Sequence, residues 1–559
     1  MGDKFFSMCM TIIAGRKASS TGEVLIGHNE DAPGRFIMQT HLVRKRRRKP
    51  GTRITFEPDL ASPELWTTRT NLFWSEAMTC SEDYSASAFC DLYVNGHGVV
   101  ICSNNCADSR EDSPSLTDGG IGYGLRRLVA EKAHTAREAL NLACGLVSKY
   151  GYASSGRSYA FADRDEVYVM QIVRGKHWAI SRVPDDEVAV IPNHYTIHEP
   201  DKKARGYNDL VNYAEKRGWF SPEDGEFDFA RVYQSPETYG LDKNTYRHVR
   251  AFEVLLDMDL SELHNTEWQG LPFSIKPAKP VSVDTLKTIL RSRSDTPHFS
   301  KPLTICNTET LESTIIQLRN DTDRIILRKA PGRPCYSPYL VWYFGIPDIP
   351  EDYEQTESEQ ALAEHFTLKP EAMDWRNNAW FRAMEIDAVS ELLSGEAEEK
   401  VFAGVREFER QEERELQEFD RQIELGLQNK PYIARAMMEG FTVKWACKAE
   451  ELASSLRSEL GIITGESVNA VIEGGTFRVK LDGVDVKELD AEGCICGTSY
   501  SEYSAWSRCG GIDEAEGSVE FLPGEWLKDA VPCFTDLYML LVMKSGKRRA
   551  GCVKVQVRR

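Results

Sequence analysis

Residues 9–31 read CMTIIAGRKASSTGEVLIGHNED, and this stretch decides the fold. CMTIIAG is a short β-rich run, RKASSTG is a polar turn that ends in Gly22, and EVLIGHNED is a second β-rich run. Two such runs joined by a short polar segment predict a β-hairpin. The hairpin places Cys9 at the head of its first strand and the sequence HNED at the end of its second strand.

The residues after this hairpin alternate between strand and helix patterns. β-rich runs occupy residues 92–103, 157–173 and 177–193, whereas residues 122–149 carry apolar side chains at helical spacing. Gly151 follows that helical pattern closely and is a typical end signal for a helix. Strands on both sides of a helix predict a layered α+β domain.

The rest of the chain divides by composition. Residues 300–345 return to strand patterns, residues 375–460 are helical and rich in Glu and Arg, and short runs with Gly-marked turns follow residue 460. A chain of 559 residues is too long for one compact core. We therefore expect a β-sandwich-like domain at the end of the chain. The expected units are residues 1–8, a propeptide or a start assigned too far upstream; 9–350, the layered α+β domain; 351–460, a helical extension; and 461–559, the β domain.

The bulk composition excludes several classes of protein. A net charge of −18 argues against nucleic acid or an anionic membrane as partner, and no run reaches the roughly 20 apolar residues of a membrane helix. Residues 1–15 lack an export signal, so we expect a cytoplasmic protein whose 14 cysteines are mostly reduced. The closest cysteine pairs have neither a second pair nor a histidine at zinc-site spacing. We expect no metal and no cofactor.

The position of Cys9 at the head of the hairpin makes it a candidate catalytic residue. Hydrolysis of an amide needs a nucleophile, a base and a site for the oxyanion. If Cys9 were the first residue, its α-amino group, with an unperturbed pKa of about 8, could serve as the base. Met8 directly precedes it, so initiation at Met8 with methionine removal, or self-cleavage of the Met8–Cys9 bond, would expose the amine. The alternative is that Cys9 is an ordinary buried strand thiol.

Several motifs follow the hairpin in a fixed order: LVAEKAHTAREAL, KYGY, FADRDEVYVMQIV, HWAISRVPDDEVAVIPN, STIIQLR and PCYSPY. With the hairpin, they closely resemble the dipeptidase A-like family of N-terminal-nucleophile (Ntn) hydrolases. Secernins and the group of bile-salt hydrolases and penicillin V acylases are relatives of that family. The resemblance covers about residues 9–345 and implies a four-layer αββα sandwich.

The resemblance also implies roles for individual residues. Cys9 matches the nucleophile, and Asp31 matches the carboxylate that holds the free α-amino group. Asn193 matches the asparagine whose amide donates to the oxyanion. A second oxyanion donor falls at Asn104 or Asn105, of which we favour Asn105.

Arg247 matches an arginine that lies beside the thiolate. His28 departs from the bile-salt-hydrolase branch, which has an arginine there, and an imidazole supplies a weaker, pH-dependent charge. Trp178 and Tyr195 flank Asn193 and either line the acyl pocket or pack in the core.

Each of these residues also has an ordinary interpretation. Asn193 follows a proline and could cap a turn, Asp31 could form an Asx-turn, and Arg247 could lie on the surface. It is their joint occurrence in the order of the family that favours the catalytic interpretation.

The predicted function is a cysteine dipeptidase that cleaves short peptides through a thioester on Cys9. One alternative is an N-acyl amidase or acyltransferase that uses the same residues. Another is a non-catalytic interaction protein in which Cys9 stays blocked. The sequence is compatible with a homo-oligomer as well as with a monomer.

Overall fold

The structure of the protein is a computed structural model. It describes residues 9–31, 37–57, 59–78, 92–106, 109–238, 242–265, 270–293, 304–354, 378–467, 471–472, 475–497, 505–525 and 534–557. The expected start segment, residues 1–8, lies outside the described residues. Helices and sheets both contribute to the fold, so the predicted α+β class is confirmed.

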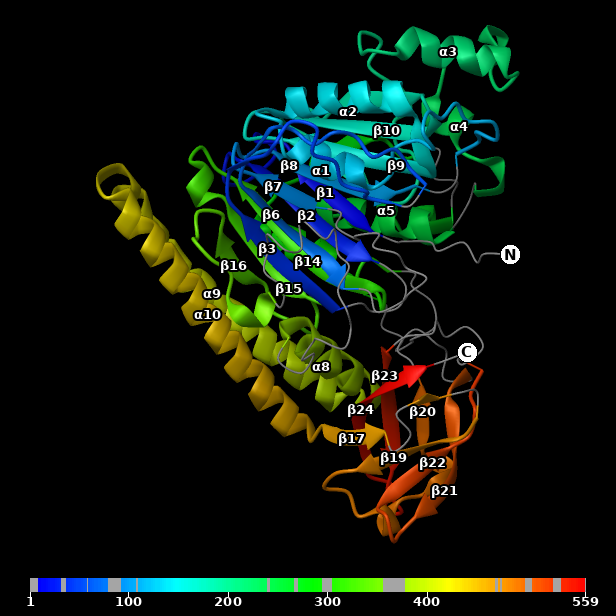
Figure 1. Ribbon diagram of the computed structural model, residues 1–559, viewed down its shortest axis with the longest axis vertical. Helices are drawn as coiled ribbons and strands as arrows, with labels where there is room; N and C mark the ends of the chain where they lie inside the picture. Colours follow the sequence, from blue (N-terminus) through cyan, green and yellow to red (C-terminus); the bar gives the residue numbers. More distant parts are fainter. Residues whose placement is uncertain are drawn as a thin grey trace.

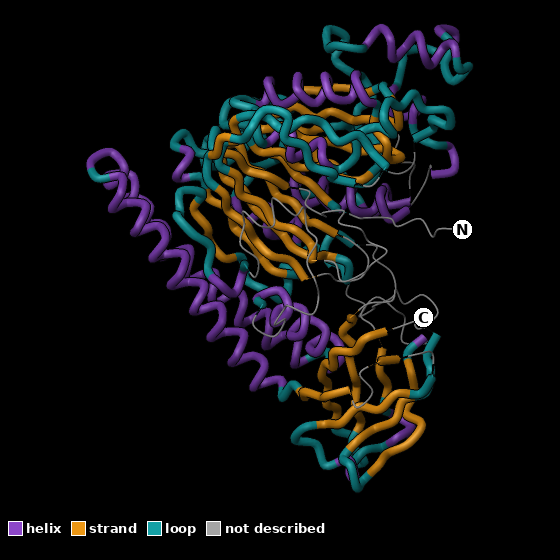
Figure 2. The backbone as a smooth tube through the Cα atoms, in the orientation of Figure 1, coloured by secondary structure: helices purple, strands orange, loops and turns teal. Residues whose placement is uncertain are grey.

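Two seven-stranded antiparallel sheets form the body that holds Cys9 (Figures 1 and 2). The first sheet has the order β13 (Ser274–Ile275), β12 (Val188–Ile191), β1 (Met10–Ala14), β2 (Val24–Asp31), β14 (Thr310–Leu318), β15 (Ile326–Pro331) and β16 (Leu340–Tyr343). The second has the order β11 (Trp178–Arg182), β10 (Val167–Gly175), β9 (Tyr152–Ala162), β8 (Val100–Asn105), β7 (Leu92–Asn95), β6 (Leu72–Met78) and β3 (Ile37–Val43). A two-stranded ribbon joins β4 (Arg46–Arg47) and β5 (Thr68–Arg69).

The predicted hairpin is confirmed and lies near the centre of the first sheet. β1 and β2 pair antiparallel with Thr11 opposite His28 and Ile13 opposite Ile26. All residues of both strands are buried. Because successive side chains on a strand point to opposite faces, each strand contributes to both the space between the sheets and the outer helical layer.

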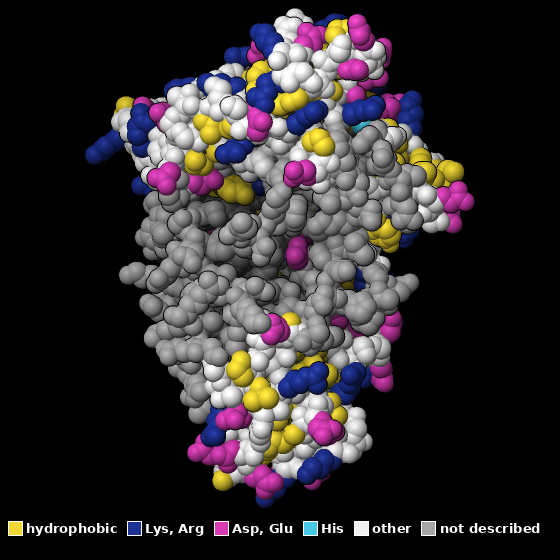
Figure 3. All heavy atoms as spheres, turned by 90° about the vertical axis from the view of Figure 1, so that its right-hand side faces the viewer, with side chains coloured by type: hydrophobic (Ala, Val, Ile, Leu, Met, Phe, Trp, Pro, Cys, Tyr) yellow, Lys and Arg dark blue, Asp and Glu magenta, His cyan; other side chains and the backbone are white. Residues whose placement is uncertain are grey.

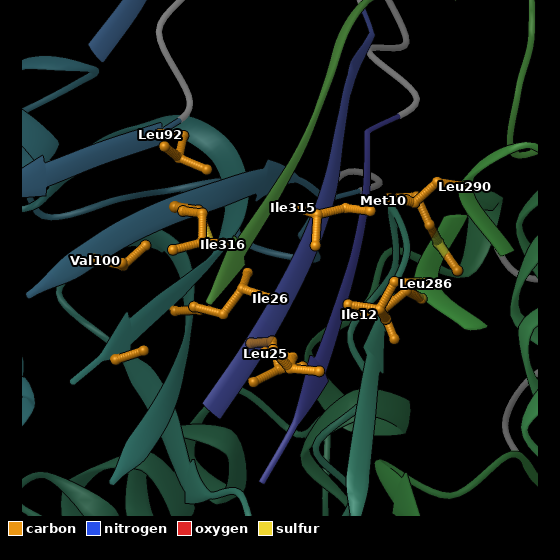
Figure 4. Close-up of a cluster of buried hydrophobic side chains, with 14 of the residues drawn as sticks. Met10, Ile12, Leu25, Ile26, Leu92, Val100, Leu286, Leu290, Ile315 and Ile316 are labelled. Carbon is orange, nitrogen blue, oxygen red and sulfur yellow. The ribbon is translucent and has the colours of Figure 1, made fainter. Parts of the chain in front are cut away.

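Figure 4 shows these two faces in the apolar core. Ile26 lies on the side of Val100 and Ile316, whereas Ile12 lies close to Leu286 of the outer helical layer. All of these residues are at most 1% exposed. The strand that follows Cys9 is therefore fixed by packing on both of its faces.

Helices pack on the outer face of each sheet (Figure 1). The first sheet contacts α5 (Asp242–Leu256) and α6 (Val283–Leu290), and the second contacts α1 (Gly124–Ala130) and α2 (Ala136–Tyr150). The single helix expected at residues 122–149 is thus two helices. Thr135 explains the break, because its side chain caps α2 by accepting from the Glu138 amide. α3 (Tyr207–Lys216) and α4 (Phe229–Tyr233) lie in the connection to α5.

The run at residues 177–193 is divided between the two sheets. β11 is the edge strand of the second sheet, whereas β12 pairs with β1 in the first sheet. Pro184 and the two aspartates after it lie in the turn that joins them. This crossing brings Asn193, two residues after β12, to the end of β1 at which Cys9 lies.

In the described part of the chain after β16, three α-helices follow: α8 (Ala379–Leu393), α9 (Glu396–Asn429) and α10 (Pro431–Leu460). α9 and α10 form a long hairpin along the first sheet (Figure 1). One stripe of α9 is buried. Glu409 and Glu412 lie on this stripe and accept the amides of Tyr339 and Val341 at 2.8 and 3.0 Å. None of the described helices combines the length and hydropathy needed to cross a membrane.

The last unit contains β17 (Ile463–Ser467), β18 (Val471–Ile472), β19 (Phe477–Leu481), β20 (Ile495–Gly497), β21 (Ser507–Asp513), β22 (Ser518–Phe521), β23 (Phe534–Val542) and β24 (Arg548–Val557). These strands do not form two separate sheets, as a β-sandwich would. β17 pairs with both β19 and β24, so the hydrogen-bonded strands close into a ring. On the face in Figure 3, acidic and basic side chains of this unit are interspersed.

A buried histidine connects the second sheet to the start of the helical part, and it predicts how stability depends on pH. His41 Nε2 lies 2.9 Å from Glu76 Oε1, and its Nδ1 lies 3.2 Å from Glu354 Oε1. Burial alone would lower the pKa of His41, but the two carboxylates raise it from 6.5 to about 9. The stabilisation is therefore complete below about pH 6.5 and is lost as the pH rises through about 9.

We expect His41→Gln to destabilise the protein most at low pH. The difference in unfolding free energy from wild type should shrink by about 3 kcal/mol between about pH 6 and about pH 9. Urea unfolding across this range measures it, with the exposed His134→Gln as the matched control that keeps the wild-type profile. Parallel curves for wild type and His41→Gln would contradict the ion-pair assignment.

Candidate active site

Cys9 lies directly before β1 and is fully buried. Its Sγ is 3.6 Å from the carbonyl oxygen of Asp31, at the end of the neighbouring strand β2. Arg247 Nη1, from α5, donates to the Cys9 carbonyl oxygen at 3.4 Å. Cys9 therefore contacts both the neighbouring strand of the hairpin and helix α5 of the outer layer.

The Asp31 carboxylate is held by groups at the start of β14. Asn307 Nδ2 donates to Asp31 Oδ2 at 2.9 Å, and Thr310, the cross-strand partner of Asp31, adds a side-chain hydrogen bond. Burial raises the pKa of Asp31 to about 6, against the opposing effects of Thr310, Arg247 and Asn307. Because burial disfavours the carboxylate, a nearby cation would be strongly attracted to it.

Arg247 orients Asn193. Its Nη2 donates to Asn193 Oδ1 at 2.6 Å and to Asn244 Oδ1 at 2.7 Å. A guanidinium can only donate, so the oxygen of the Asn193 amide faces Arg247 and the amide nitrogen points away. That nitrogen donates to the Asn105 carbonyl oxygen at 2.6 Å, and Asn244 Nδ2 donates to the Asn193 carbonyl oxygen at 3.2 Å. The orientation of Asn193 is thereby defined.

Two buried arginines interact electrostatically with Cys9. Arg247 is one, and Arg157 of β9 is the other. Burial lowers the pKa of Arg247 although Asp31 and Cys9 oppose the shift. Positive charge beside a thiol favours the thiolate, which is the nucleophilic form of cysteine. The arrangement therefore combines a thiol, a buried carboxylate, amide donors and two cations.

A model of peptidase family C69 matches residues 8–372. The chain belongs to this family. The predicted dipeptidase A-like resemblance and the predicted peptidase activity are thereby confirmed.

Similar proteins carry dipeptidase names. A protein of Latilactobacillus sakei described as a probable dipeptidase is 24% identical over 400 residues, which cover 65% of this chain and 78% of that protein. A probable dipeptidase of Salmonella dublin is 25% identical over 374 residues, covering 60% of this chain and 81% of that protein. A solved variant of the conjugated bile acid hydrolase from Clostridium perfringens covers 62% of this chain and 94% of its own, with 11% identity and a TM-score of 0.33.

In this C69 peptidase, His28 and Asn104 lie between the sheets. The Thr11 hydroxyl donates to Asn104 Oδ1 at 2.6 Å and lies 2.8 Å from His28 Nδ1. Asn104 Nδ2 donates to the Ile191 carbonyl oxygen at 2.9 Å. Burial lowers the pKa of His28 to about 3, so its ring is neutral. Both side chains therefore contact the hairpin and the strands next to it. The positive charges that act on Cys9 come from Arg247 and Arg157, not from His28.

Asn105 contacts Asn193, whereas the side chain of Asn104 contacts Thr11 and Ile191. The Asn105 carbonyl oxygen accepts from Asn193, and Asn105 Oδ1 is buried without a hydrogen bond from the described part of the chain. The role of Asn105 as the second oxyanion donor stays a prediction.

The two aromatic candidates have packing contacts. Trp178 lies in the apolar cluster beneath α2, on the outer face of the second sheet, and its Nε1 donates to the Arg205 carbonyl oxygen at 3.1 Å. Tyr195 is fully buried, donates to the Ile172 carbonyl oxygen at 2.9 Å and packs on Phe229. The structure does not bring Trp178 together with Cys9.

Four residues around the site were not predicted from the sequence. Asn244 had a local signal, because it precedes Arg247 by three residues and so shares its helix face. Arg157, Asn307 and Thr310 had none, since their contacts depend on strands distant in sequence. No cluster of three or more potential metal ligands occurs among the described residues.

Proposed function

We propose that this C69 peptidase is a cysteine dipeptidase whose nucleophile is Cys9 Sγ. The observation that carries the proposal is the convergence of Asp31, Arg247 and Asn193 around a cysteine at the head of β1. The fold proposed for it is the αββα sandwich of Ntn hydrolases.

The mechanism requires a free α-amino group on Cys9. Removal of residues 1–8, or a start at Met8 with methionine removal, would expose it. The amine then takes the thiol proton, directly or through a water, and Asp31 holds the resulting ammonium. Because this places a cation beside Asp31, the pKa of Asp31 in the mature enzyme should fall below its value of about 6.

Acyl transfer proceeds in two steps. The Cys9 thiolate attacks the peptide carbonyl, and the oxyanion accepts hydrogen bonds from the second N–H of Asn193 Nδ2 and from Asn105 Nδ2. The ammonium gives its proton to the departing amine as the C–N bond breaks and the thioester forms. Water then attacks the thioester and restores the thiol.

Intact-mass measurement combined with a substrate panel tests this function. We expect a mature amino terminus at Cys9 and hydrolysis of unmodified dipeptides, with activity unchanged by EDTA. N-acylated amino acids form the comparison arm, and preferential cleavage of these would favour the amidase alternative. Activity in protein that retains residues 1–8 would contradict the need for a free amine.

A further inference from the structure

Two thiols outside the active site are in direct contact. Cys306 Sγ and Cys335 Sγ are 3.2 Å apart, and both are free cysteines. Cys306 is buried, whereas Cys335 is partly exposed. A disulfide bond is about 2.05 Å long, so these sulfurs need to approach by only about 1 Å to bond.

The surroundings make the two thiols chemically unequal. Cys335 Sγ donates to the Arg291 carbonyl oxygen at 3.2 Å. The hydrogen bond from Cys306 and the charges of Arg291, Arg333 and Arg293 lower the pKa of Cys335. Burial raises the pKa of Cys306 well above its ordinary value. A partly exposed cysteine with a lowered thiol pKa beside a second, buried thiol is the usual arrangement of a redox-sensing pair.

We propose that Cys306 and Cys335 are a redox-sensitive dithiol that closes to a disulfide when the protein meets hydrogen peroxide. The Cys335 thiolate attacks one peroxide oxygen, the O–O bond breaks, and a sulfenic acid forms with release of hydroxide. The Cys306 sulfur then attacks the Cys335 sulfur, and its proton leaves with the hydroxyl as water. Two thiols lose two electrons in total, and one peroxide becomes two waters.

The dithiol adjoins the proposed active site through one residue. Cys306 precedes Asn307, whose side chain holds the Asp31 carboxylate. On the other side, Cys335 lies between Arg333, which pairs with Asp387 at 3.1 Å, and a tyrosine that donates to Glu398. Because these contacts anchor the Cys335 segment to α8 and α9, closure should draw Cys306 toward it and shift Asn307 relative to Asp31. This consequence rests on the proposed function.

Peptide mapping of the full-length protein tests the dithiol directly. After treatment with hydrogen peroxide and alkylation, we expect a linked peptide pair containing Cys306 and Cys335 that disappears on reduction. Cys335→Ser should abolish the linked pair. Cys447→Ser, which removes an exposed free cysteine, is the matched control and should leave it unchanged. If both thiols remain alkylatable at peroxide doses that oxidise Cys447, the proposal is overturned.

Activity measurements test the coupling to Asp31 separately. Peroxide also attacks Cys9, so wild type and Cys335→Ser are compared at equal fractions of unmodified Cys9, read from the peptide map. We expect kcat/KM of oxidised wild type to be several-fold lower than that of oxidised Cys335→Ser. Equal kcat/KM values in the two oxidised proteins would overturn the coupling to Asp31. The linked peptide would still support the disulfide between Cys306 and Cys335. Absence of peptidase activity in the reduced protein would count against the proposed function alone.

Discussion

Cys9→Ala protein is expected to fold normally and to lose dipeptidase activity by on the order of 10⁴-fold or more. Alanine keeps the Cβ but removes the only atom that can form the thioester, so no other group in the arrangement can replace it. The measurement is kcat/KM on a dipeptide with mature protein, and circular dichroism verifies the fold.

The matched control for this variant is Cys144→Ala. Cys144 is also buried, but it belongs to the apolar cluster beneath α2. Its removal should lower stability and leave the turnover of folded enzyme unchanged. Dipeptidase activity in Cys9→Ala close to that of wild type would rule out the thioester mechanism.

Asn193→Asp should lower kcat by about 10²–10³-fold with a much smaller change in KM. Aspartate keeps an oxygen toward Arg247 Nη2, so the anchor of the side chain survives. It replaces the amide nitrogen, however, with an oxygen that cannot donate to an oxyanion. The variant therefore separates the donor function of Asn193 from its contact with Arg247, which Asn193→Ala would not.

Asn95→Ala is the control for loss of a buried asparagine. Asn95 Nδ2 donates to the carbonyl oxygens of Ala130 and Ala133 at 3.0 and 2.7 Å, away from Cys9. We expect reduced stability with kcat unchanged in the folded fraction. A wild-type kcat in Asn193→Asp would remove Asn193 from the oxyanion site.

Sequence patterns within one short segment predicted those parts of the site that depend on residues close together in the chain. The β1–β2 hairpin was readable because strand alternation and turn composition are properties of one short segment. Asn193, Asp31 and Arg247 came from a family resemblance rather than from local physics. In the structure, Arg247 donates a hydrogen bond to Asn193 and interacts electrostatically with Asp31. How they act in catalysis stays a prediction.

Contacts between distant segments were not readable from the sequence. Nothing in the pattern around Asn307 indicates that its amide reaches Asp31 from the start of another strand. The division of residues 177–193 between two sheets was missed for the same reason, since both halves have equal β character. The break before Thr135 was missed because the apolar spacing continues across it.

The central position of β1 has a consequence for how the protein is made. β1 forms its backbone hydrogen bonds with β2 on one side and with β12 on the other. β2 in turn pairs with β14, which ends at Leu318. β1 is thus enclosed only after β14, which follows it by roughly 300 residues, has been synthesised. At roughly 5–20 residues per second this is a delay of tens of seconds. During that interval the Cys9 strand is available to chaperones, and a mature active site is expected only after it.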